Sequence, residues 1–490
     1  MTRTVEVRSG AYRDSVGLMQ ISSQLRTLPG VEAALVAMAT ELNVELLDSM
    51  GFDRPAATSP NDMLVAIEAA DDDAVAEALR ALEAALVAAP SAGSGNATDV
   101  APPTVLAAAR RSPAQLALIS TPGAVAAIDA ADALGAALDV MIFSDNVAVE
   151  HEIALKKMAA AAGLLVMGPD CGTAVVGGVG LGFANVVRPG PVGIVAASGT
   201  GAQHLMALLD GAGVGVTQCI GVGGRDLSAA VRGRSTLAAL ERLDADDSVT
   251  IIVVVSKPPA DEVADLVTAH AEGLRTPTVL GYLGSGRPDI TATAQRVVEA
   301  TGAAWQQPRR WGGELPPPRD GDLRGLFTGG TLCDEAMLIA TEQLGPVASN
   351  IALTGGTRLD ADLASLGHTF IDFGDDQLTV GRPHPMIDPT LRLERLAAEL
   401  ADPACAVVMI DVVLGHGAHA DPATDLAATI RGADTPAVVS LVGTRDDPQG
   451  LEAQAQTLAD AGAFVHASNA AATREALSLL VGRHAPEDAP

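Results

Sequence analysis

The sequence predicts a multi-domain α/β protein, and three observations support this fold class. Short runs rich in Val, Ile and Leu alternate with Ala-rich stretches of helical periodicity, a pattern typical of buried parallel strands joined by helices. Hydrophobic residues make up 48% of the chain and aromatic residues only 2%, so we expect aliphatic cores. With 490 residues, the chain is long enough for about three or four domains.

The first segments predict a small N-terminal α/β domain over residues 1–98, which ends in a Gly- and Ser-rich linker. Its strands are expected at residues 5–7, 31–38 and 62–67, and its helices at residues 15–25 and 73–87. Residues 104–190 then predict the βαβ units of a Rossmann-like domain. The strands of that domain are expected at residues 116–120, 140–143 and 164–167.

Two later segments, residues 191–305 and 325–484, each alternate strands and helices again, and each predicts a flavodoxin-like domain. Both contain, in the same order, a glycine turn after a strand, a second strand, a turn with Pro and Ala, and a further strand. This shared order indicates an internal duplication. Residues 306–324 contain four prolines and predict a linker between the two copies.

Each copy contains a glycine-rich turn that predicts an anion site. In residues 193–203 an apolar run ends in Ser-Gly-Thr-Gly and a helical pattern follows; residues 325–335 repeat this arrangement. Free backbone N–H groups and the positive end of the helix dipole converge at such a helix start, which suits phosphate. Two such turns predict two helices aimed at one anion. The predicted phosphate-binding residues are Ser198, Gly199, Thr200, Gly201, Gly329, Gly330 and Thr331.

Composition argues against several functional classes. The formal net charge of −29 disfavours nucleic acids and anionic membranes as partners. No apolar run reaches the roughly 18–20 residues of a membrane helix, and the N-terminus predicts a strand instead of a signal peptide. The four cysteines are scattered without CxxC spacing, so we expect neither a metal site nor disulfides, and a cytoplasmic location.

Four further side chains are candidates for catalysis. Arg225 follows Gly223 and Gly224 at the carboxyl end of a strand, the edge where α/β sheets bind ligands. Lys257 comes just after another strand. His384 and His419 follow strands of the second copy, and histidine suits proton transfer near neutral pH. Additional candidates for substrate binding are Gly223, Gly224, Arg382 and Cys171. For Cys171, an inert buried thiol is the alternative.

Several motifs resemble succinyl-CoA synthetase. Residues 168–171 (Gly-Pro-Asp-Cys), 193–200 and 221–224 (Gly-Val-Gly-Gly) are similar to segments of its α subunit, and residues 325–484 resemble the C-terminal domain of its β subunit. Together with residues 9–15 and 38–43, nearly the whole chain resembles the FdrA family. This resemblance implies a CoA-binding-type domain followed by two synthetase-type flavodoxin-like domains.

The resemblance also implies two activities. FdrA proteins carry the label of acyl-CoA synthetases. Members are also implicated as one subunit of oxamate carbamoyltransferase, which converts oxalurate and phosphate to oxamate and carbamoyl phosphate during allantoin breakdown. The second activity implies small anionic substrates, no required cofactor, and homo-oligomers or hetero-oligomers with other carbamoyltransferase subunits.

Departures from the synthetase pattern decide between these activities. The nucleotide-grasping domain is absent, and no histidine occurs in residues 284–291 or 443–449, where a phosphohistidine loop is expected. Lys257 stands where the synthetase has a Glu that orients phosphohistidine. No Gly-rich CoA turn is evident near residues 116–123, although CoA binding stays possible. We therefore predict a carbamoyltransferase subunit; the alternatives are an acyl-CoA synthetase and a non-catalytic scaffold.

Overall fold

The computed structural model describes residues 1–11, 13, 15–55, 58–59, 61–88, 102–379 and 383–481. The chain forms two compact units. One contains Met1–Ala101 and Gln377–Asp388, and the other contains Pro102–Asp376 and Pro389–Pro490. The short helix α12 (Asp376–Thr379) spans the boundary between them. Arg382, a predicted substrate-binding residue, lies outside the described residues.

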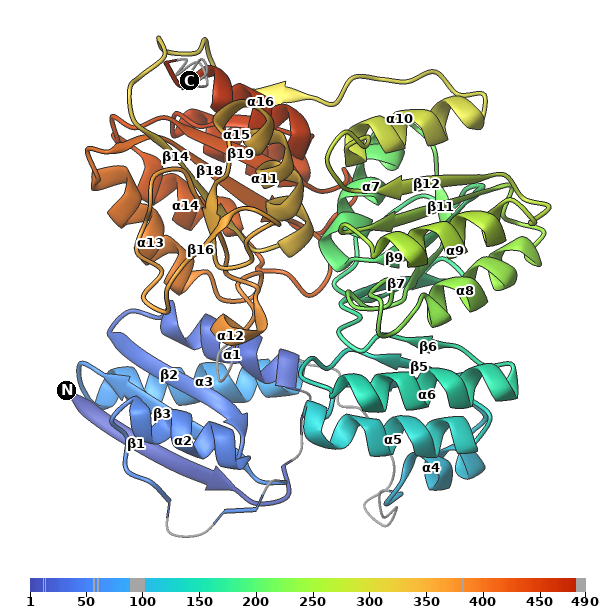
Figure 1. The fold of residues 1–490 in the computed structure, drawn as a ribbon. Helices are drawn as coiled ribbons and strands as arrows, with labels where there is room; N and C mark the ends of the chain where they lie inside the picture. The colour runs from blue at the N-terminus through green and yellow to red at the C-terminus, as the bar shows by residue number, and fades with distance from the viewer. Residues whose placement is uncertain are drawn as a thin grey trace. The chain divides into compact units, whose positions relative to one another are not determined.

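The N-terminal domain is a three-stranded antiparallel sheet in the order β1-β3-β2 with helices on both faces (Figure 1). Its elements are β1 (Thr2–Arg8), α1 (Ser15–Arg26), β2 (Val31–Met38), α2 (Glu41–Ser49), β3 (Met63–Ala69) and α3 (Asp72–Ala88). Leu18, Ile67 and Leu82 share a core that joins α1 and α3 to one face of the sheet. Leu47 of α2 packs with Phe52 and Ala66 in another cluster. The three predicted strands and two predicted helices are confirmed, while α2 was not predicted.

The second unit begins with a small parallel sheet in the order β4-β5-β6. The elements of this Rossmann-like part are α4 (Val105–Arg111), β4 (Leu116–Ile119), α5 (Gly123–Gly135), β5 (Asp139–Ile142), α6 (Val149–Ala162) and β6 (Val166–Met167). Small alanines such as Ala126 and Ala130 are fully buried, which lets α5 pack closely on the sheet. The three strands predicted from sequence are confirmed.

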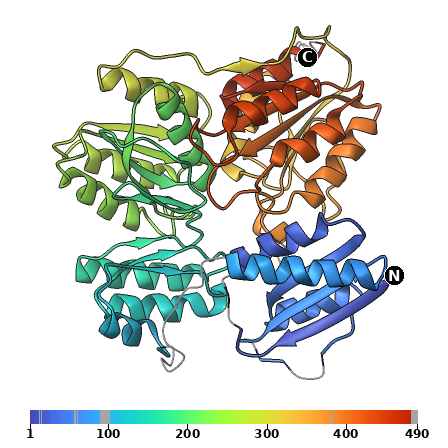
Figure 2. The ribbon, with the colours of Figure 1, turned by 180° about the vertical axis from the view of Figure 1, so that it is seen from behind.

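A six-stranded sheet follows, in the order β12-β11-β9-β10-β7-β8. It belongs to the green part of the ribbon in Figure 2. Its elements are β7 (Thr173–Val176), β8 (Val179–Gly182), β9 (Val192–Ala197), α7 (Gly199–Gly211), β10 (Val216–Gly221), α8 (Arg234–Asp244), β11 (Ile251–Ser256), α9 (Asp261–Ala271), β12 (Thr278–Tyr282) and α10 (Ile290–Ala300). The first four strands in this order are parallel, and β7 and β8 extend the sheet as an antiparallel hairpin. That hairpin was not predicted.

The last sheet has eight strands in the order β13-β20-β19-β18-β14-β17-β15-β16. Its strands are β13 (Arg310–Trp311), β14 (Asp322–Phe327), β15 (Ala348–Ser349), β16 (Thr357–Arg358), β17 (Thr369–Asp372), β18 (Cys405–Val413), β19 (Ala437–Val442) and β20 (Phe464–His466). Its helices are α11 (Gly330–Leu344), α13 (Thr390–Ala401), α14 (Pro422–Ile430), α15 (Leu451–Asp460) and α16 (Asn469–Ser478). Within the segment predicted as a linker, β13 pairs with β20.

The two larger sheets contain the same four-stranded unit. The order β12-β11-β9-β10 of the first matches β19-β18-β14-β17 of the second, all parallel. In each unit the first strand, β9 or β14, is central and leads through a glycine turn into α7 or α11. The structure is therefore a multi-domain α/β fold with two flavodoxin-like halves, as the sequence predicts.

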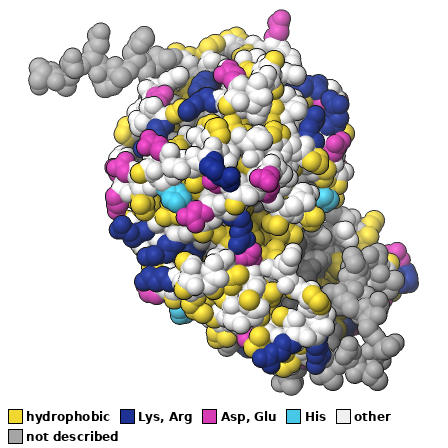
Figure 3. Space-filling view, turned by 90° about the vertical axis from the view of Figure 1, so that its right-hand side faces the viewer, with side chains coloured by type: hydrophobic (Ala, Val, Ile, Leu, Met, Phe, Trp, Pro, Cys, Tyr) yellow, Lys and Arg dark blue, Asp and Glu magenta, His cyan; other side chains and the backbone are white. Residues whose placement is uncertain are grey.

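Basic and acidic side chains are interspersed with apolar ones on the face shown in Figure 3. Within the described parts of the chain, no helix combines the length and apolarity that crossing a membrane requires.

Candidate active site at the start of α11

The two predicted glycine turns contact each other. Ser198 Oγ and Thr331 Oγ1 form a hydrogen bond of 2.6 Å, and both side chains are buried. A methyl group placed on Gly329 would lie 2.5 Å from Thr200 Oγ1, so this glycine allows the two turns to approach. The first turns of α7 and α11 thus meet in one place, as the duplication predicts. Whether they bind phosphate stays a prediction.

The start of α7 carries a conventional cap. Ser198 is the N-cap residue, and its hydroxyl accepts a hydrogen bond of 2.9 Å from the N–H of Gly201. A methyl group on Gly201 would lie 2.5 Å from Ser198 Oγ, so the capping geometry requires glycine here. Gly199 and Thr200 are partly accessible.

The start of α11 is held differently, because its N-cap residue, Gly329, has no side chain to cap the helix. The carboxylate of Asp411, near the carboxyl end of β18, accepts hydrogen bonds from the N–H groups of Thr328 (2.7 Å) and Gly329 (3.0 Å). Asp411 also forms an ion pair of 2.8 Å with Arg392 Nη1. Burial raises the pKa of Asp411, although Arg392 opposes the shift. Sequence reasoning missed both residues, since nothing in an apolar strand pattern indicates which turn a buried carboxylate will reach.

Lys257 brings a positive charge to the first residue of α11. Its side chain is 38% exposed, and Nζ lies 3.7 Å from Asp334 Oδ2. A methyl group on Gly330 would lie only 2.5 Å from this Nζ. Burial alone would lower the pKa of Lys257, but the carboxylates of Asp334, Asp372 and Asp170 raise it above its ordinary value. The amine is therefore a cation at neutral pH, next to the positive end of the helix dipole.

Carboxyl groups surround this lysine, and sequence reasoning did not identify them. Asp372 ends β17 and is buried; its Oδ1 accepts a hydrogen bond of 2.9 Å from the N–H of Gly374. Burial raises the pKa of Asp372 to about 7, with Lys257 opposing the shift. Desolvation by the surrounding protein, together with the charges of Asp376 and Asp145, also raises the pKa of Asp170 to about 7. The position of Asp372 at the carboxyl end of a parallel strand was the available signal.

Arg225 is tied to the Rossmann-like part of the unit. Its Nη2 donates to the carbonyl oxygen of Val147 (2.8 Å) and lies 3.0 Å from Glu152 Oε2. The fully buried Lys156 bonds Glu152 Oε1 at 2.8 Å. These contacts give Arg225 an anchoring role, although its side chain is 47% exposed.

The glycines before Arg225 pack against the 168–170 turn. Gly223 has a φ of +87°, and a methyl group there would lie 2.4 Å from the carbonyl oxygen of Pro169. A methyl group on Gly224 would lie 3.9 Å from Asp170 Oδ2. Gly223 therefore allows the close packing of this turn, whereas Gly224 has room for a side-chain carbon.

The remaining predicted residues described by the structure are His384, His419 and Cys171. His384 belongs to the unit of the N-terminal domain, and its Nδ1 accepts from the N–H of Met386 at 3.2 Å. His419, in the loop after β18, accepts from the N–H of Asp421 at 3.2 Å. Cys171 is buried and donates to the carbonyl oxygen of Gly221 at 3.3 Å. Burial raises the pKa of this thiol to about 12, which favours the alternative of an inert thiol.

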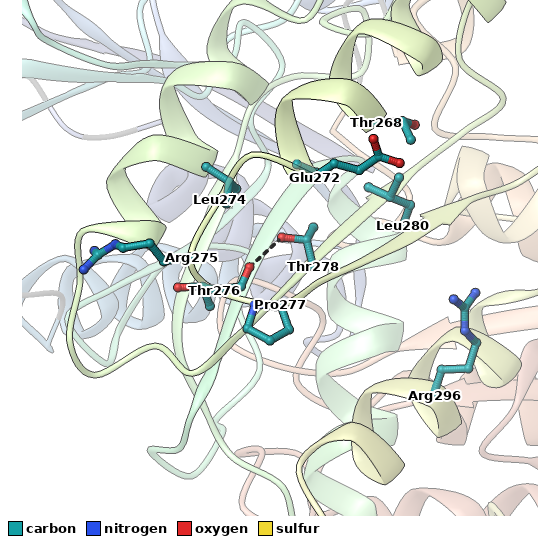
Figure 4. Close-up of a pocket in the computed structure, with 10 residues that line it drawn as sticks. Thr268, Glu272, Leu274, Arg275, Thr276, Pro277, Thr278, Leu280 and Arg296 are labelled. Carbon is teal, nitrogen blue, oxygen red and sulfur yellow. Dashed lines mark hydrogen bonds between the residues drawn. The ribbon is translucent and has the colours of Figure 1, made fainter.

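A groove of about 510 Å³ opens elsewhere, near the amino end of β12 (Figure 4). Its lining includes Thr276, Thr278 and Leu280, with Arg275 and Arg296 at opposite sides. The groove lies at the opposite end of this strand from the edge that carries the glycine turns, so we do not assign it to the site. No group of three or more His, Cys, Asp or Glu in the described chain is arranged to hold a metal ion.

The fold and the helix starts define a class: a multi-domain α/β protein with CoA-ligase-type domains. Residues 326–479 match the family model described as CoA-ligase, and residues 1–102 match the model described as AllF, heavy metal-associated domain. The chain is 26% identical over 152 residues to the α subunit of ADP-forming succinate–CoA ligase from Methanothermobacter thermautotrophicus; that match covers 30% of this chain and 50% of the relative.

The chain belongs to the same family as the uncharacterized protein YahF of Escherichia coli K12. The two are 39% identical over 501 aligned positions, which cover 96% of this chain and 97% of YahF. Among solved structures, ATP citrate lyase from Methanothrix soehngenii, in complex with citrate and coenzyme A, is similar with a TM-score of 0.33 and 16% identity. That match covers 41% of this chain and 37% of the lyase, too little to carry an argument about function.

The heavy-metal label of the N-terminal family model does not fit the residues present. Soft metals are held mainly by thiolate and imidazole ligands, which methionine thioethers supplement at copper sites. Residues 1–102 contain neither cysteine nor histidine. The match therefore describes the fold of this domain, and we derive no metal chemistry from it.

Proposed function

We propose that the chain is an FdrA-type subunit of a carbamoyltransferase that binds phosphate or carbamoyl phosphate at the start of α11. One observation carries the proposal: the ammonium group of Lys257 lies against the first residue of α11, where the helix dipole adds positive potential. Thr200 and Gly199, from the facing turn, are partly accessible beside it. An anion there would meet a fixed cation and helix N–H groups.

The reaction we propose is the phosphorolysis of oxalurate. A phosphate oxygen forms a bond to the terminal carbamoyl carbon. The bond from that carbon to the nitrogen that links it to the oxalyl group breaks. The proton lost by phosphate goes to the departing nitrogen, so the products are carbamoyl phosphate and oxamate. Lys257 would neutralise the phosphate, and N–H groups of the helix starts would stabilise the negative oxygen of the intermediate.

The loops at which a phosphohistidine would be expected support a reaction without one. In the loop before α10, Asp289 caps the helix by accepting from the N–H of Ala292 at 2.7 Å, and it pairs with Arg474 at 2.7 Å. In the corresponding loop after β19, Asp447 accepts from the N–H groups of Thr444 and Val186, each at 2.7 Å. Both loops are thus fixed by carboxylates and contain no histidine.

Phosphate binding tests the proposal directly. Calorimetric titration with inorganic phosphate should show saturable binding to the full chain, and Lys257→Ala should weaken it at least tenfold, about 1.4 kcal/mol. Lys157→Ala, on the exposed face of α6, is the matched control and should bind as the unaltered chain does. Phosphorolysis of oxalurate is then assayed with the proteins encoded by neighbouring genes. No phosphate binding, or equal binding by Lys257→Ala, would refute the proposal.

A second candidate is an acyl-CoA synthetase, favoured by the CoA-ligase match over residues 326–479. That activity needs CoA binding and a phosphorylated residue. Incubation with labelled ATP followed by a search for acid-labile protein phosphate separates the two, because we expect none from the carbamoyltransferase. The remaining alternative, a non-catalytic scaffold, predicts no thermal shift with phosphate or carbamoyl phosphate.

A further inference from the structure

The side chains of Asp372 and Lys257 both approach Gly330, the first residue of α11. A methyl group on Gly330 would lie 2.7 Å from Asp372 Oδ2 and 2.5 Å from Lys257 Nζ. The carboxylate and the ammonium group therefore lie side by side at the first residue of α11. Any anion held by Lys257 at this helix start would be within reach of a group that accepts and donates protons.

The backbone of Asp372 is held by an unusual clamp. The side chain of Asn350 donates from Nδ2 to the carbonyl oxygen of Asp372 at 2.8 Å and accepts at Oδ1 from its N–H at 2.9 Å. Strands β15 and β17 pair through Ser349 and Phe370. The side-chain amide of Asn350 therefore continues the hydrogen-bond ladder past the end of β15. With Gly374 bound to Oδ1, three hydrogen bonds fix Asp372 while Oδ2 faces Lys257.

Three charged groups face this carboxyl from other elements: Lys257 after β11, Asp334 on α11 and Asp411 on β18. Burial is the largest influence and, with the two aspartates, raises the pKa of Asp372, whereas Lys257 and the hydrogen bond from Gly374 lower it. Such opposing influences keep both forms accessible near neutral pH, which a group that accepts and returns a proton needs. The corresponding position in the first half is Gly221, aligned through the strand pairs Ala196–Gly221 and Phe327–Asp372.

We propose that Asp372 is the catalytic acid–base group of this site and that Asn350 is its positioning residue. The proposal rests on the function proposed above. The ionised carboxylate takes the proton from the attacking phosphate oxygen as the new oxygen–carbon bond forms. The resulting carboxylic acid returns that proton to the nitrogen as the carbon–nitrogen bond breaks. Asp372 ends each cycle ionised, so atoms and charges balance without another reactant.

The test compares Asp372→Asn with the unaltered chain in the complete enzyme with its partner subunits. The amide keeps the size of the side chain but cannot carry the proton, so turnover should fall at least about 100-fold. Phosphate affinity, measured calorimetrically, should stay within about threefold, since Lys257 and the helix start remain. Turnover within tenfold of normal would overturn the assignment of Asp372. A chain that binds no phosphate before substitution would overturn the proposed function itself.

Asn350→Ala tests the positioning role. It should lower kcat while leaving the KM for phosphate nearly unchanged, because the anion contacts are elsewhere. It should also shift the acidic limb of the pH–rate profile, which a merely structural loss would not move. Asn350→Asp keeps the acceptor for the Asp372 N–H and should recover part of kcat. A fall in kcat accompanied by an equally large rise in KM, with an unchanged pH profile, would contradict this role.

Discussion

The two flavodoxin-like halves share a strand order but secure their first helices by different means. In the first half, Ser198 caps α7 through its own hydroxyl. In the second half, Gly329 has no such group, and Asp411 reaches the turn from the neighbouring strand. The corresponding position in the first half is Val255, because the strand pairs Val254–Val195 and Ile410–Leu326 align the two copies. A duplicated backbone thus tolerates either a local cap or a remote one.

The strand ends differ more, and this difference locates the chemistry. After β11, Lys257 is 38% exposed and faces α11. After β18, the carbonyl oxygen of Leu414 accepts from Gln203 of α7 at 3.3 Å and from Asn185 at 2.9 Å. The next residue, Gly415, packs closely against Ala184. A methyl group on Gly415 would lie 2.6 Å from the carbonyl oxygen of Ala184. One half keeps an accessible cation, whereas the residue equivalent to Lys257 in the other half is Val413, which is buried at the end of β18.

Replacing Asp411, which holds the start of α11 from the neighbouring strand, should have the largest effect on the free energy of unfolding. Asp411→Asn leaves Arg392 buried without its ionic partner, and breaking a buried pair from one side costs about 3–5 kcal/mol. Urea denaturation monitored by circular dichroism measures the loss. The double variant Asp411→Asn/Arg392→Gln removes the unpaired charge and should recover part of it. A loss below about 1 kcal/mol for the single variant would mean that the turn does not depend on Asp411.

The glycines that begin the two helices provide a matched pair for the site. Gly330→Ala should displace Lys257 or Asp372, which lie 2.5 and 2.7 Å from the added methyl group, and weaken phosphate binding about 10- to 100-fold. Gly199→Ala adds a methyl group that meets only Thr173 Oγ1, at the ordinary distance of 3.6 Å. Because the substitution leaves the backbone N–H of this turn in place, phosphate binding should be nearly unchanged. Calorimetric titration of both variants compares them. Equal effects would contradict the placement of the site at α11.

These pairs also show how far sequence could lead. The hydrophobic runs identified β9, β10, β11 and β12 of the first half and β18 and β19 of the second, but not β17, which carries Asp372. The repeated glycine turns indicated that α7 and α11 are equivalent. Asp372 and Asp411 were missed because their roles depend on contacts across strands and halves, such as the 2.7 Å bond from Thr328 to Asp411. Lys257 was identified from its place after a strand. Two of its carboxyl neighbours, Asp334 and Asp372, come from the other half, and no local pattern indicates them.

A third comparison concerns Glu335 and His204, which occupy equivalent places on α11 and α7 and are both fully buried. Burial, and then the charge of Asp289, raises the pKa of Glu335 from 4.5 to about 7, while burial lowers that of His204 to about 4. A raised carboxyl pKa stabilises the fold below pH 4.5, and this stability is lost as the pH rises through about 7.

The Glu335→Gln side chain cannot ionise. At pH 8 the variant should therefore have a free energy of unfolding about 1–2 kcal/mol higher than that of the unaltered chain, whereas at pH 5 the two chains should be about equally stable. Gln retains an acceptor for the N–H of Ile290, which Glu335 binds at 2.7 Å. Urea titrations at the two pH values supply the measurement, with His204→Gln as the control expected to show no such pH-dependent difference. A constant difference at both pH values would exclude ionisation of Glu335 as its cause.

The local cap should show the smallest effect. Ser198→Ala removes the bond to the N–H of Gly201 and the contact with Thr331, and losing an N-cap costs about 1 kcal/mol. Ser478→Ala, at an exposed site in α16, should change stability by less than about 0.5 kcal/mol. If Ser198→Ala instead equals Asp411→Asn in urea denaturation, the Ser198–Thr331 contact couples the halves strongly. Both helix starts would then have to be treated as one structural unit.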